Sequence, residues 1–178
     1  MKVYPITPRG YCKGVVRAIE LAKKQAHQDD VYILGMIVHN QYIVDALNNL
    51  GVKTIDKKGA SREELLDQVS QGTVIITAHG ASHNVIKKAH SKNIQVINAT
   101  CPDVIKTHDL IKNYLNQGIE ILYIGKAGHP ESEGALSIDP AHIHLIENKT
   151  DFETMSLQIK RQCLYMMFMI YVNMLKQN

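Results

Sequence analysis

Several features of secreted, membrane-spanning and nucleic-acid-binding proteins are missing from this sequence of 178 residues. Its three cysteines are odd in number and widely spaced, which argues against a disulfide framework. The N-terminus lacks the apolar stretch of a signal peptide. The longest apolar run, residues 164–175, is interrupted by Asn173 and is shorter than the roughly 20 residues that cross a bilayer. These absences predict a cytoplasmic protein with no membrane partner.

The charges are not gathered into a basic patch either. The formal net charge is +3, but the positive residues are scattered along the chain, so we expect no nucleic-acid partner. No Gly-x-Gly-x-x-Gly or Walker-type loop occurs, which argues against nucleotide binding. A hydrophobic content of 45% and a charged content of 21% are typical of a globular protein. The mildly basic balance suits a small anionic substrate.

Short apolar runs alternate with amphipathic segments of helical length. The expected strands are residues 3–6, 31–34, 52–55, 73–77, 95–98, 119–124 and 143–146, and the expected helices are residues 14–27, 41–50, 82–91 and 102–117, with one more that follows a capping box at Ser61. Strands separated by helices favour parallel pairing and right-handed crossovers, hence a doubly wound α/β fold. The rhythm restarts near Ala99. We therefore expect a first α/β domain at residues 1–98 and an incomplete second one at 99–151.

Residues 152–178 differ from the rest of the chain. Five of the seven methionines fall there, and neither a turn signal nor a strand–helix rhythm is visible. One interpretation is a Met-rich helix that closes the core, because methionine fills irregular gaps. The other is a divergent tail that does not belong to the parent fold, as a frameshift would produce. We favour the divergent tail.

Two cysteines lie where an apolar strand gives way to a helix. Pro102 is well placed as a first helical residue, so Cys101 lies at a helix N-terminus, where a thiolate is favoured. Cys12 lies between glycines and beside basic residues, which also favours the thiolate. The alternative is that each is a small buried hydrophobe. Because the carboxyl ends of parallel strands open onto one crevice, we expect both thiols in a metal or cluster site.

Three histidines, His39, His79 and His129, occupy equivalent strand ends. They are candidates for metal ligands, diphosphate donors or ordinary loop residues, and a glycine beside His79 and His129 lets backbone amides approach an anion. A zinc site is possible, although no Cys-x-x-Cys pair supports it. Glu131 follows His129 closely and is placed to relay a proton if burial raises its pKa. Alternatively, Glu131 is a first-turn helix residue that the helix dipole favours.

Five segments in order carry a resemblance to a known family. They are Arg9-Gly10-Tyr11-Cys12-Lys13-Gly14-Val15, Val38-His39-Asn40, Thr77-Ala78-His79-Gly80, Asn98-Ala99-Thr100-Cys101-Pro102 and Gly125-Lys126-Ala127-Gly128-His129-Pro130-Glu131. The chain resembles the 4-hydroxy-3-methylbut-2-enyl diphosphate reductases, the IspH/LytB family, from Lys2 to about Asp151. That family performs the last step of the non-mevalonate isoprenoid pathway.

The resemblance implies a fold and a cofactor. The fold is a trefoil of three small doubly wound α/β domains, of which the third is missing here. The cofactor is a 4Fe-4S cluster held by three cysteines, with one iron left without a protein ligand. Cys12 and Cys101 match two of the three cysteines. Cys163 has the wrong neighbours, so the third cysteine ligand is expected to be absent from this chain.

The resemblance also implies an activity. The family removes the hydroxyl of an allylic diphosphate reductively and yields isopentenyl and dimethylallyl diphosphates, with ferredoxin or flavodoxin as electron donor. It assigns substrate binding to His39, His79 and His129 and proton delivery to Glu131. Because the family's Thr-rich segment and Ser-Asn-Ser motif do not occur here, we expect impaired activity. The alternatives are a non-catalytic truncated fragment and a small zinc-binding α/β module.

Overall fold

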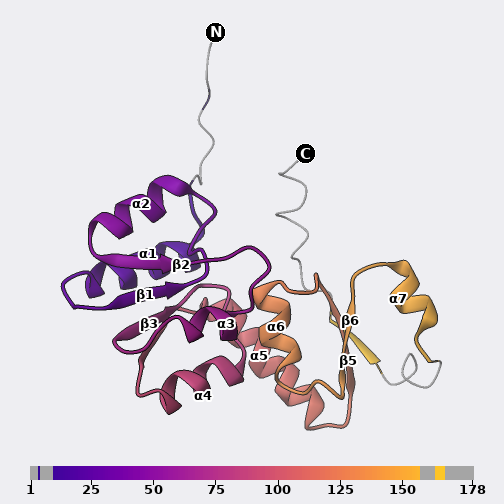
Figure 1. The fold of residues 1–178 in the computed structure, drawn as a ribbon. Helices are drawn as coiled ribbons and strands as arrows, with labels where there is room; N and C mark the ends of the chain where they lie inside the picture. Colours follow the sequence, from indigo (N-terminus) through magenta and orange to yellow (C-terminus); the bar gives the residue numbers. More distant parts are fainter. Residues whose placement is uncertain (1–3, 5–9, 157–162, 167–178) are drawn as a thin grey trace.

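The computed structural model describes residue 4, residues 10–156 and residues 163–166 (Figure 1). Helices and strands alternate along this part of the chain. The helices are α1 (Lys13–Gln25), α2 (Gln41–Asn49), α3 (Arg62–Asp67), α4 (His83–Ser91), α5 (Pro102–Leu115), α6 (Pro130–Leu136) and α7 (Lys149–Thr154). The strands are β1 (Val31–Leu34), β2 (Val52–Ile55), β3 (Thr73–Ile76), β4 (Gln95–Asn98), β5 (Glu120–Ile124), β6 (Ile143–Ile146) and β7 (Cys163–Met166).

The first half of the chain forms a four-stranded parallel sheet in the order β2-β1-β3-β4. Helices α1 and α2 pack on one face, where residues such as Ala18 and Ile33 form a buried core. Helices α3 and α4 pack on the other face, around Leu66 and Ile76. Side chains alternate between the two faces along a strand, so β1 and β3 supply apolar side chains to both cores. The sheet is therefore doubly wound, and the predicted α/β fold class with parallel sheets is confirmed.

The second sheet is smaller and also parallel, with β5 between β6 and β7. Its core joins α5 and α6 to the sheet through Ile111, Ile121 and Ala135, which are fully buried. The pairing of β7 with β5 brings residues 163–166 into this sheet. Helix α7 and strand β7 thus lie partly or wholly beyond residue 151, where the sequence shows no strand–helix rhythm.

The other predicted elements agree with the structure. The strands and helices expected between residues 14 and 124, and the strand at 143–146, are present with small shifts at their ends. The capping box at Ser61 is also present, because Ser61 and Glu64 bond each other's backbone amides. The expected strand at residues 3–6 lies outside the described residues. The boundaries at residues 98 and 151 stay predictions.

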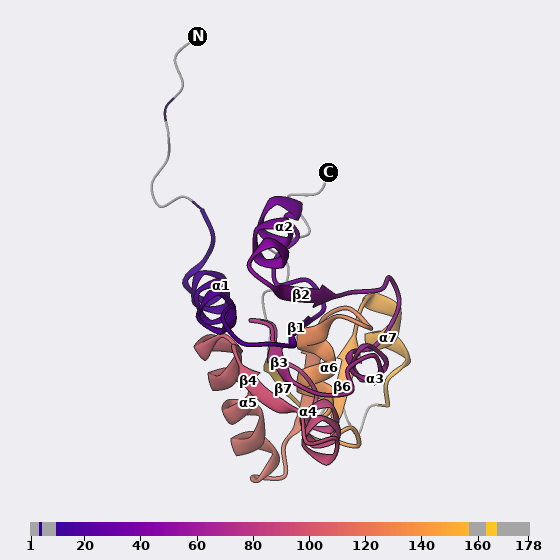
Figure 2. The ribbon, with the colours of Figure 1, turned by 60° about the vertical axis from the view of Figure 1, so that its left-hand side comes forward.

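The two sheets lie side by side, and α5 connects them (Figures 1 and 2). Helix α6 also lies against the loop that follows β3. A Cβ added at Gly134 of α6 would be 3.8 Å from the carbonyl oxygen of Ala81 in that loop, and 3.3 Å from His108 of α5. In the described ranges, no helix combines the length and the apolar character that a bilayer crossing requires.

Candidate functional site

The carboxyl ends of three neighbouring strands carry the candidate residues of the first sheet. Strands β1, β3 and β4 are adjacent, and the loops that follow them carry His39, His79 and Cys101. The Cys101 amide donates a hydrogen bond to the carbonyl of Ala78 at 2.9 Å, which joins the cysteine to the residue before His79. This is the edge of a parallel α/β sheet at which ligands commonly bind.

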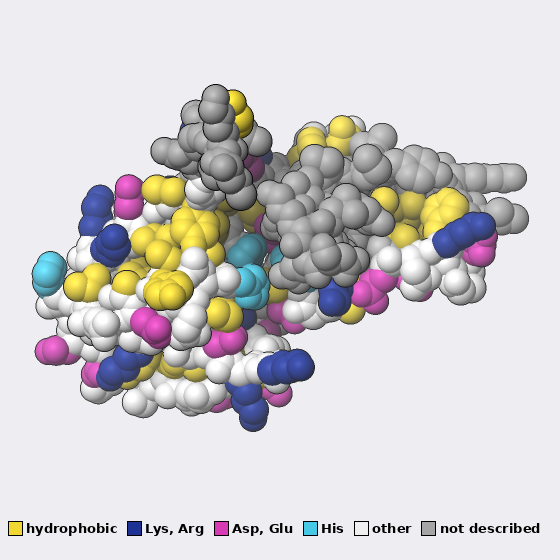
Figure 3. Space-filling view, turned by 90° about the horizontal axis from the view of Figure 1, so that it is seen from above, with side chains coloured by type: hydrophobic (Ala, Val, Ile, Leu, Met, Phe, Trp, Pro, Cys, Tyr) yellow, Lys and Arg dark blue, Asp and Glu magenta, His cyan; other side chains and the backbone are white. Residues whose placement is uncertain are grey.

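The second sheet completes a pocket at this edge. His129 follows β5 and caps the N-terminus of α6. It meets His79 edge to face, with 5.7 Å between the ring centroids and an interplanar angle of 78°. His39, His79 and His129 all line one cavity of about 280 Å³, which we call the histidine pocket. Its other lining residues are Gly35, Met36, Asp56, Ala60, Arg62, Leu65, Lys126, Ala127, Gly128, Pro130 and Glu133. Histidine side chains are visible near the middle of the molecule in Figure 3.

Two of the three imidazoles are held in the neutral form. Burial, followed by the nearby His129, Arg62 and His39, lowers the pKa of His79 to about 4. Burial and the same Arg62 also lower the pKa of His129. His129 accepts a hydrogen bond at Nδ1 from the Glu131 amide at 3.3 Å, so its proton lies on Nε2. His129 is thereby set to donate from Nε2.

Glu131 lies in the first turn of α6, next to His129 but outside the lining of the histidine pocket. Burial raises the pKa of its carboxyl group. Burial and the charge of Glu131 together raise the pKa of Tyr123 to about 12. A carboxyl group that retains its proton closer to neutral pH is suited to general-acid chemistry.

Cys12 and Cys101 are the N-cap residues of α1 and α5, and neither side chain makes a capping hydrogen bond. The start of α1 lies against Cys101: a Cβ added at Gly14 would be 2.7 Å from the Cys101 Sγ. Arg17 of α1 also donates to the carbonyl of Thr100 at 3.0 Å. The structure thus holds the segment that carries Cys12 against the loop that carries Cys101. Neither cysteine lines the histidine pocket.

The donor chemistry of Cys12 and Cys101 is suited to ligands of an iron–sulfur cluster. Both thiols lie at helix N-termini, where a thiolate is stabilised, and only a glycine at position 14 leaves room beside the Cys101 sulfur. Across the ranges that the structure describes, no group of three or more His, Cys, Asp or Glu side chains is placed to hold a single metal ion. The zinc alternative therefore lacks a ligand set there.

Sequence analysis missed four charged residues of the histidine pocket: Asp56, Arg62, Lys126 and Glu133. Lys126 lies inside a segment that carries the family resemblance. Arg62 lies between Ser61 and Glu64 of the capping box, and its sequence neighbours give only a signal for a helix start. Asp56 is the residue after β2, so its place at a strand end was a signal that could have found it.

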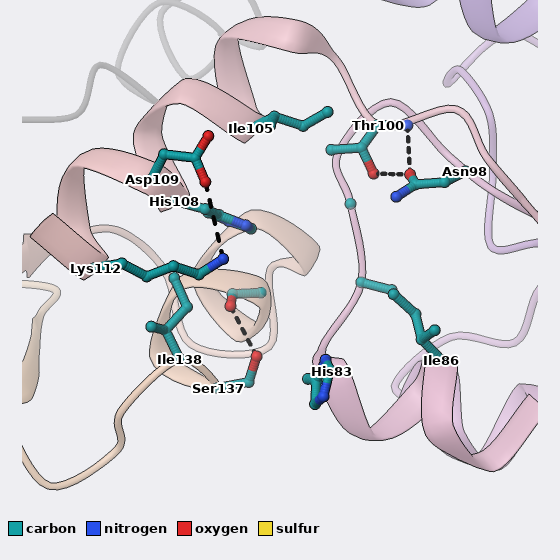
Figure 4. A pocket seen from close by; sticks show the side chains of 13 residues that line it. His83, Ile86, Asn98, Thr100, Ile105, His108, Asp109, Lys112, Ser137 and Ile138 are labelled. Atoms are coloured by element: carbon teal, nitrogen blue, oxygen red, sulfur yellow. Dashed lines mark hydrogen bonds and ion pairs between the residues drawn. The ribbon is translucent and has the colours of Figure 1, made fainter.

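A second and larger cavity, of about 460 Å³, lies between α4, α5 and the end of α6 (Figure 4). His83, His108 and Lys112 line it, and Lys112 lies 3.9 Å from Asp109. None of the residues proposed from the sequence lines this cavity. It is therefore separate from the histidine pocket.

Together, the fold and the site define an α/β protein with a histidine-lined pocket at the carboxyl edge of its sheets and two free thiols at the N-termini of α1 and α5. A family model described as "LytB protein" matches residues 3–173. The chain therefore belongs to the LytB family. The match extends past Asp151, where we had expected the resemblance to end.

Relatives and solved structures agree with this assignment. A protein of Brevibacillus brevis named 4-hydroxy-3-methylbut-2-enyl diphosphate reductase is 52% identical over 161 residues, which are 88% of this chain and 51% of the relative. A protein of the same name from Symbiobacterium thermophilum is 49% identical over 160 residues, 88% of this chain and 54% of the relative. The chain thus spans about half the length of these curated relatives.

Two solved structures share the fold. The E-1-hydroxy-2-methyl-but-2-enyl-4-diphosphate reductase of Plasmodium falciparum matches with a TM-score of 0.79 and 28% identity, over 96% of this chain and 54% of that one. A structure titled (E)-4-hydroxy-3-methyl-but-2-enyl diphosphate reductase matches with a TM-score of 0.67 and 32% identity, over 80% of this chain and 50% of that one.

Proposed function

We propose that this chain carries the substrate-binding histidines and two cluster ligands of a 4-hydroxy-3-methylbut-2-enyl diphosphate reductase. The observation that carries the proposal is the convergence of His39, His79 and His129, from both sheets, on one pocket. Membership of the LytB family supports it, since the curated relatives named above bear this activity in their names.

The histidine pocket binds the anionic substrate. Neutral imidazoles donate a hydrogen bond from one ring nitrogen, and the Nδ1 of His129 is already occupied as an acceptor, which leaves its Nε2–H for a phosphate oxygen or the allylic hydroxyl. Lys126 and Arg62 supply positive charge to the same cavity. The bound substrate is an allylic diphosphate.

Cys12 and Cys101 would hold a 4Fe-4S cluster as thiolates, and the third cysteine ligand of the family is absent from this chain. When bound, the cluster would pass on the two electrons of the donor and would offer a Lewis-acidic iron. Ferredoxin or flavodoxin is the electron donor that the family resemblance implies. In this reaction the allylic C–O bond breaks, the oxygen leaves as water, and two electrons and two protons enter as a C–H bond forms.

Glu131 supplies a proton to the leaving oxygen. Its buried carboxyl group has a raised pKa, which keeps a larger fraction of it protonated, and its backbone fixes the His129 ring. Replacement of Glu131 by Gln preserves the shape and removes the acid. We expect such a variant to bind inorganic diphosphate normally and to lose turnover by about a hundredfold or more, the usual range for general acids.

By itself the chain is strongly impaired as an enzyme, because it supplies two of the three cysteine ligands that the family uses. To test the proposal, residues 1–178 are expressed anaerobically with iron and sulfide, and the Brevibacillus brevis relative is prepared in parallel. We expect bound iron and labile sulfide in the chain, binding of the allylic diphosphate, and turnover far below that of the relative. Absence of both cluster and substrate binding would refute the functional assignment, whereas turnover equal to the relative's would refute the impairment.

A further inference from the structure

Arg62, the first residue of α3, is a buried cation at the wall of the histidine pocket. Only 6% of its surface is exposed, and it is among the residues that line the cavity. Among the described residues, no carboxylate oxygen lies within 4.0 Å of its nitrogens. A buried charge without a close partner is costly, so it calls for a function or a ligand.

The hydrogen bonds of Arg62 fix it in place but leave one nitrogen unused. Nε donates to the carbonyl of Leu34 at 3.2 Å, and Nη2 donates to the Thr77 hydroxyl at 2.6 Å. The remaining nitrogen, Nη1, is buried and has no partner. Leu34 ends β1, and Thr77 lies two residues before His79. The guanidinium therefore ties together the strand ends from which the pocket is built.

The backbone beside Arg62 has a conformation that favours glycine. Gly35 adopts a φ of +78°, which favours glycine, and a Cβ there would lie 3.5 Å from Nη2 of Arg62. Burial lowers the pKa of Arg62 to about 10, and the charges of Glu133 and Asp56 oppose that shift, so the guanidinium is protonated at neutral pH. Arg62 and Lys126 are the arginine and lysine side chains that line this cavity, alongside the carboxyl groups of Asp56 and Glu133.

We propose that Arg62 is a specificity-determining residue: it supplies the buried positive charge that makes the pocket prefer a diphosphate over a monophosphate. It acts through its charge at the cavity wall and through the strand ends that carry His79. This inference rests on the proposed function, because it assumes that the histidine pocket holds the anionic end of the substrate. It adds a residue that the family's sequence motifs do not mark.

The test compares inorganic diphosphate with inorganic phosphate as probes of the full chain. Affinities are measured by calorimetry at constant ionic strength for the original chain and for R62Q, R62K and K106Q. We expect diphosphate to bind more tightly than phosphate. R62Q should weaken diphosphate binding by about tenfold or more and phosphate binding by about threefold or less, since a charge-assisted bond responds to the ligand's charge. R62K, which keeps the charge, should retain most of the preference.

K106Q is the matched control, because it also removes one positive charge but from a side chain that is 79% exposed. It should leave both affinities unchanged. An R62Q variant that is folded and keeps the original preference for diphosphate would overturn the inference while leaving the proposed function standing. An original chain that binds neither probe would overturn both.

A measurement on the unmodified chain covers the case in which R62Q fails to fold. Nitrogen-15 labelling of arginine allows the Arg62 side-chain NH signals to be followed during addition of diphosphate. We expect the Arg62 signals to shift with diphosphate more than with phosphate at equal occupancy. Signals that stay unchanged while diphosphate binds would contradict the inference, and turnover plays no part in either measurement.

Discussion

The histidine pocket and the two thiols differ in how completely the polypeptide prepares them. In the pocket, His129 is oriented by a backbone amide, and Arg62 is fixed by two hydrogen bonds. At the thiols, Cys12 is exposed, Cys101 is half-buried, and neither caps its helix through the sulfur. The comparison teaches that the histidine pocket is preorganised by protein groups alone. In the proposal, the thiols would be fixed only by a group that the polypeptide does not contain.

The sharpest way to separate the two regions is to remove one thiol. In C12S and in C101S we expect loss of nearly all bound iron and labile sulfide after anaerobic reconstitution, because hydroxyl groups do not replace thiolates as cluster ligands. Binding of inorganic diphosphate should be unchanged in both variants. Equal iron content in the variants and the original chain would contradict the assignment of Cys12 and Cys101 as cluster ligands.

Burial of His79 in the histidine pocket can be tested through the pH dependence of the protein's stability. The pKa of His79 is about 4 in the folded protein, below its ordinary value of 6.5, so between these pH values the unfolded chain binds a proton that the folded chain does not. Stability from this group is therefore present above pH 6.5 and is lost as the pH falls towards 4, by about 3 kcal/mol in total.

Denaturant unfolding at pH 7 and pH 4.5 measures this loss. H79Q has no titrating imidazole, so its stability should fall less than that of the original chain over the same interval. Equal pH dependence in the two proteins would show that burial of His79 does not disfavour its charged form.

Removal of a single imidazole should weaken anion binding without abolishing it. H129A is expected to bind inorganic diphosphate about tenfold more weakly, the loss of one good hydrogen bond to a charged ligand. H83A is the matched control, because His83 lines the second cavity and not the histidine pocket. A larger effect of H83A would move the anion site to the cavity of Figure 4.

The smallest expected effect tests the contact between α1 and Cys101. Replacement of a helical glycine by alanine in open space stabilises a protein by about 0.5–1 kcal/mol. At Gly14 the added Cβ would be 2.7 Å from the Cys101 Sγ, so we expect G14A to be destabilising instead. Thermal unfolding of G14A gives the sign, with V16A at an exposed position of α1 as control. A stabilised G14A would mean that Cys101 does not lie against α1.

Much of the fold could be predicted because most helices and strands follow from patterns of neighbouring residues. The alternation of apolar runs and amphipathic segments gave the strands and most helices, and Pro102 marked the start of α5. Strand β7 could not be predicted in this way. It is four residues long, and its pairing with β5 depends on contacts distant in sequence rather than on a turn signal.

The site was predictable only where position in the fold follows from position in the sequence. His39, His79 and His129 were chosen because each follows a strand. The order of the first sheet brings His39 and His79 together, whereas His129 reaches the pocket from the second sheet. Arg62 does not directly follow a strand. Its helix packs on one face of the first sheet, and its side chain donates hydrogen bonds to Leu34 and Thr77. Only tertiary packing creates that placement.

The central claim is that the sulfurs of Cys12 and Cys101 serve one inorganic centre beside the histidine pocket. Electron paramagnetic resonance of the anaerobically reconstituted and reduced chain, recorded with and without the allylic diphosphate, tests it most directly. The account predicts an iron–sulfur signal that the diphosphate alters and that vanishes in C12S and in C101S. A signal that survives both substitutions, or that ignores the diphosphate at saturating concentration, would contradict it.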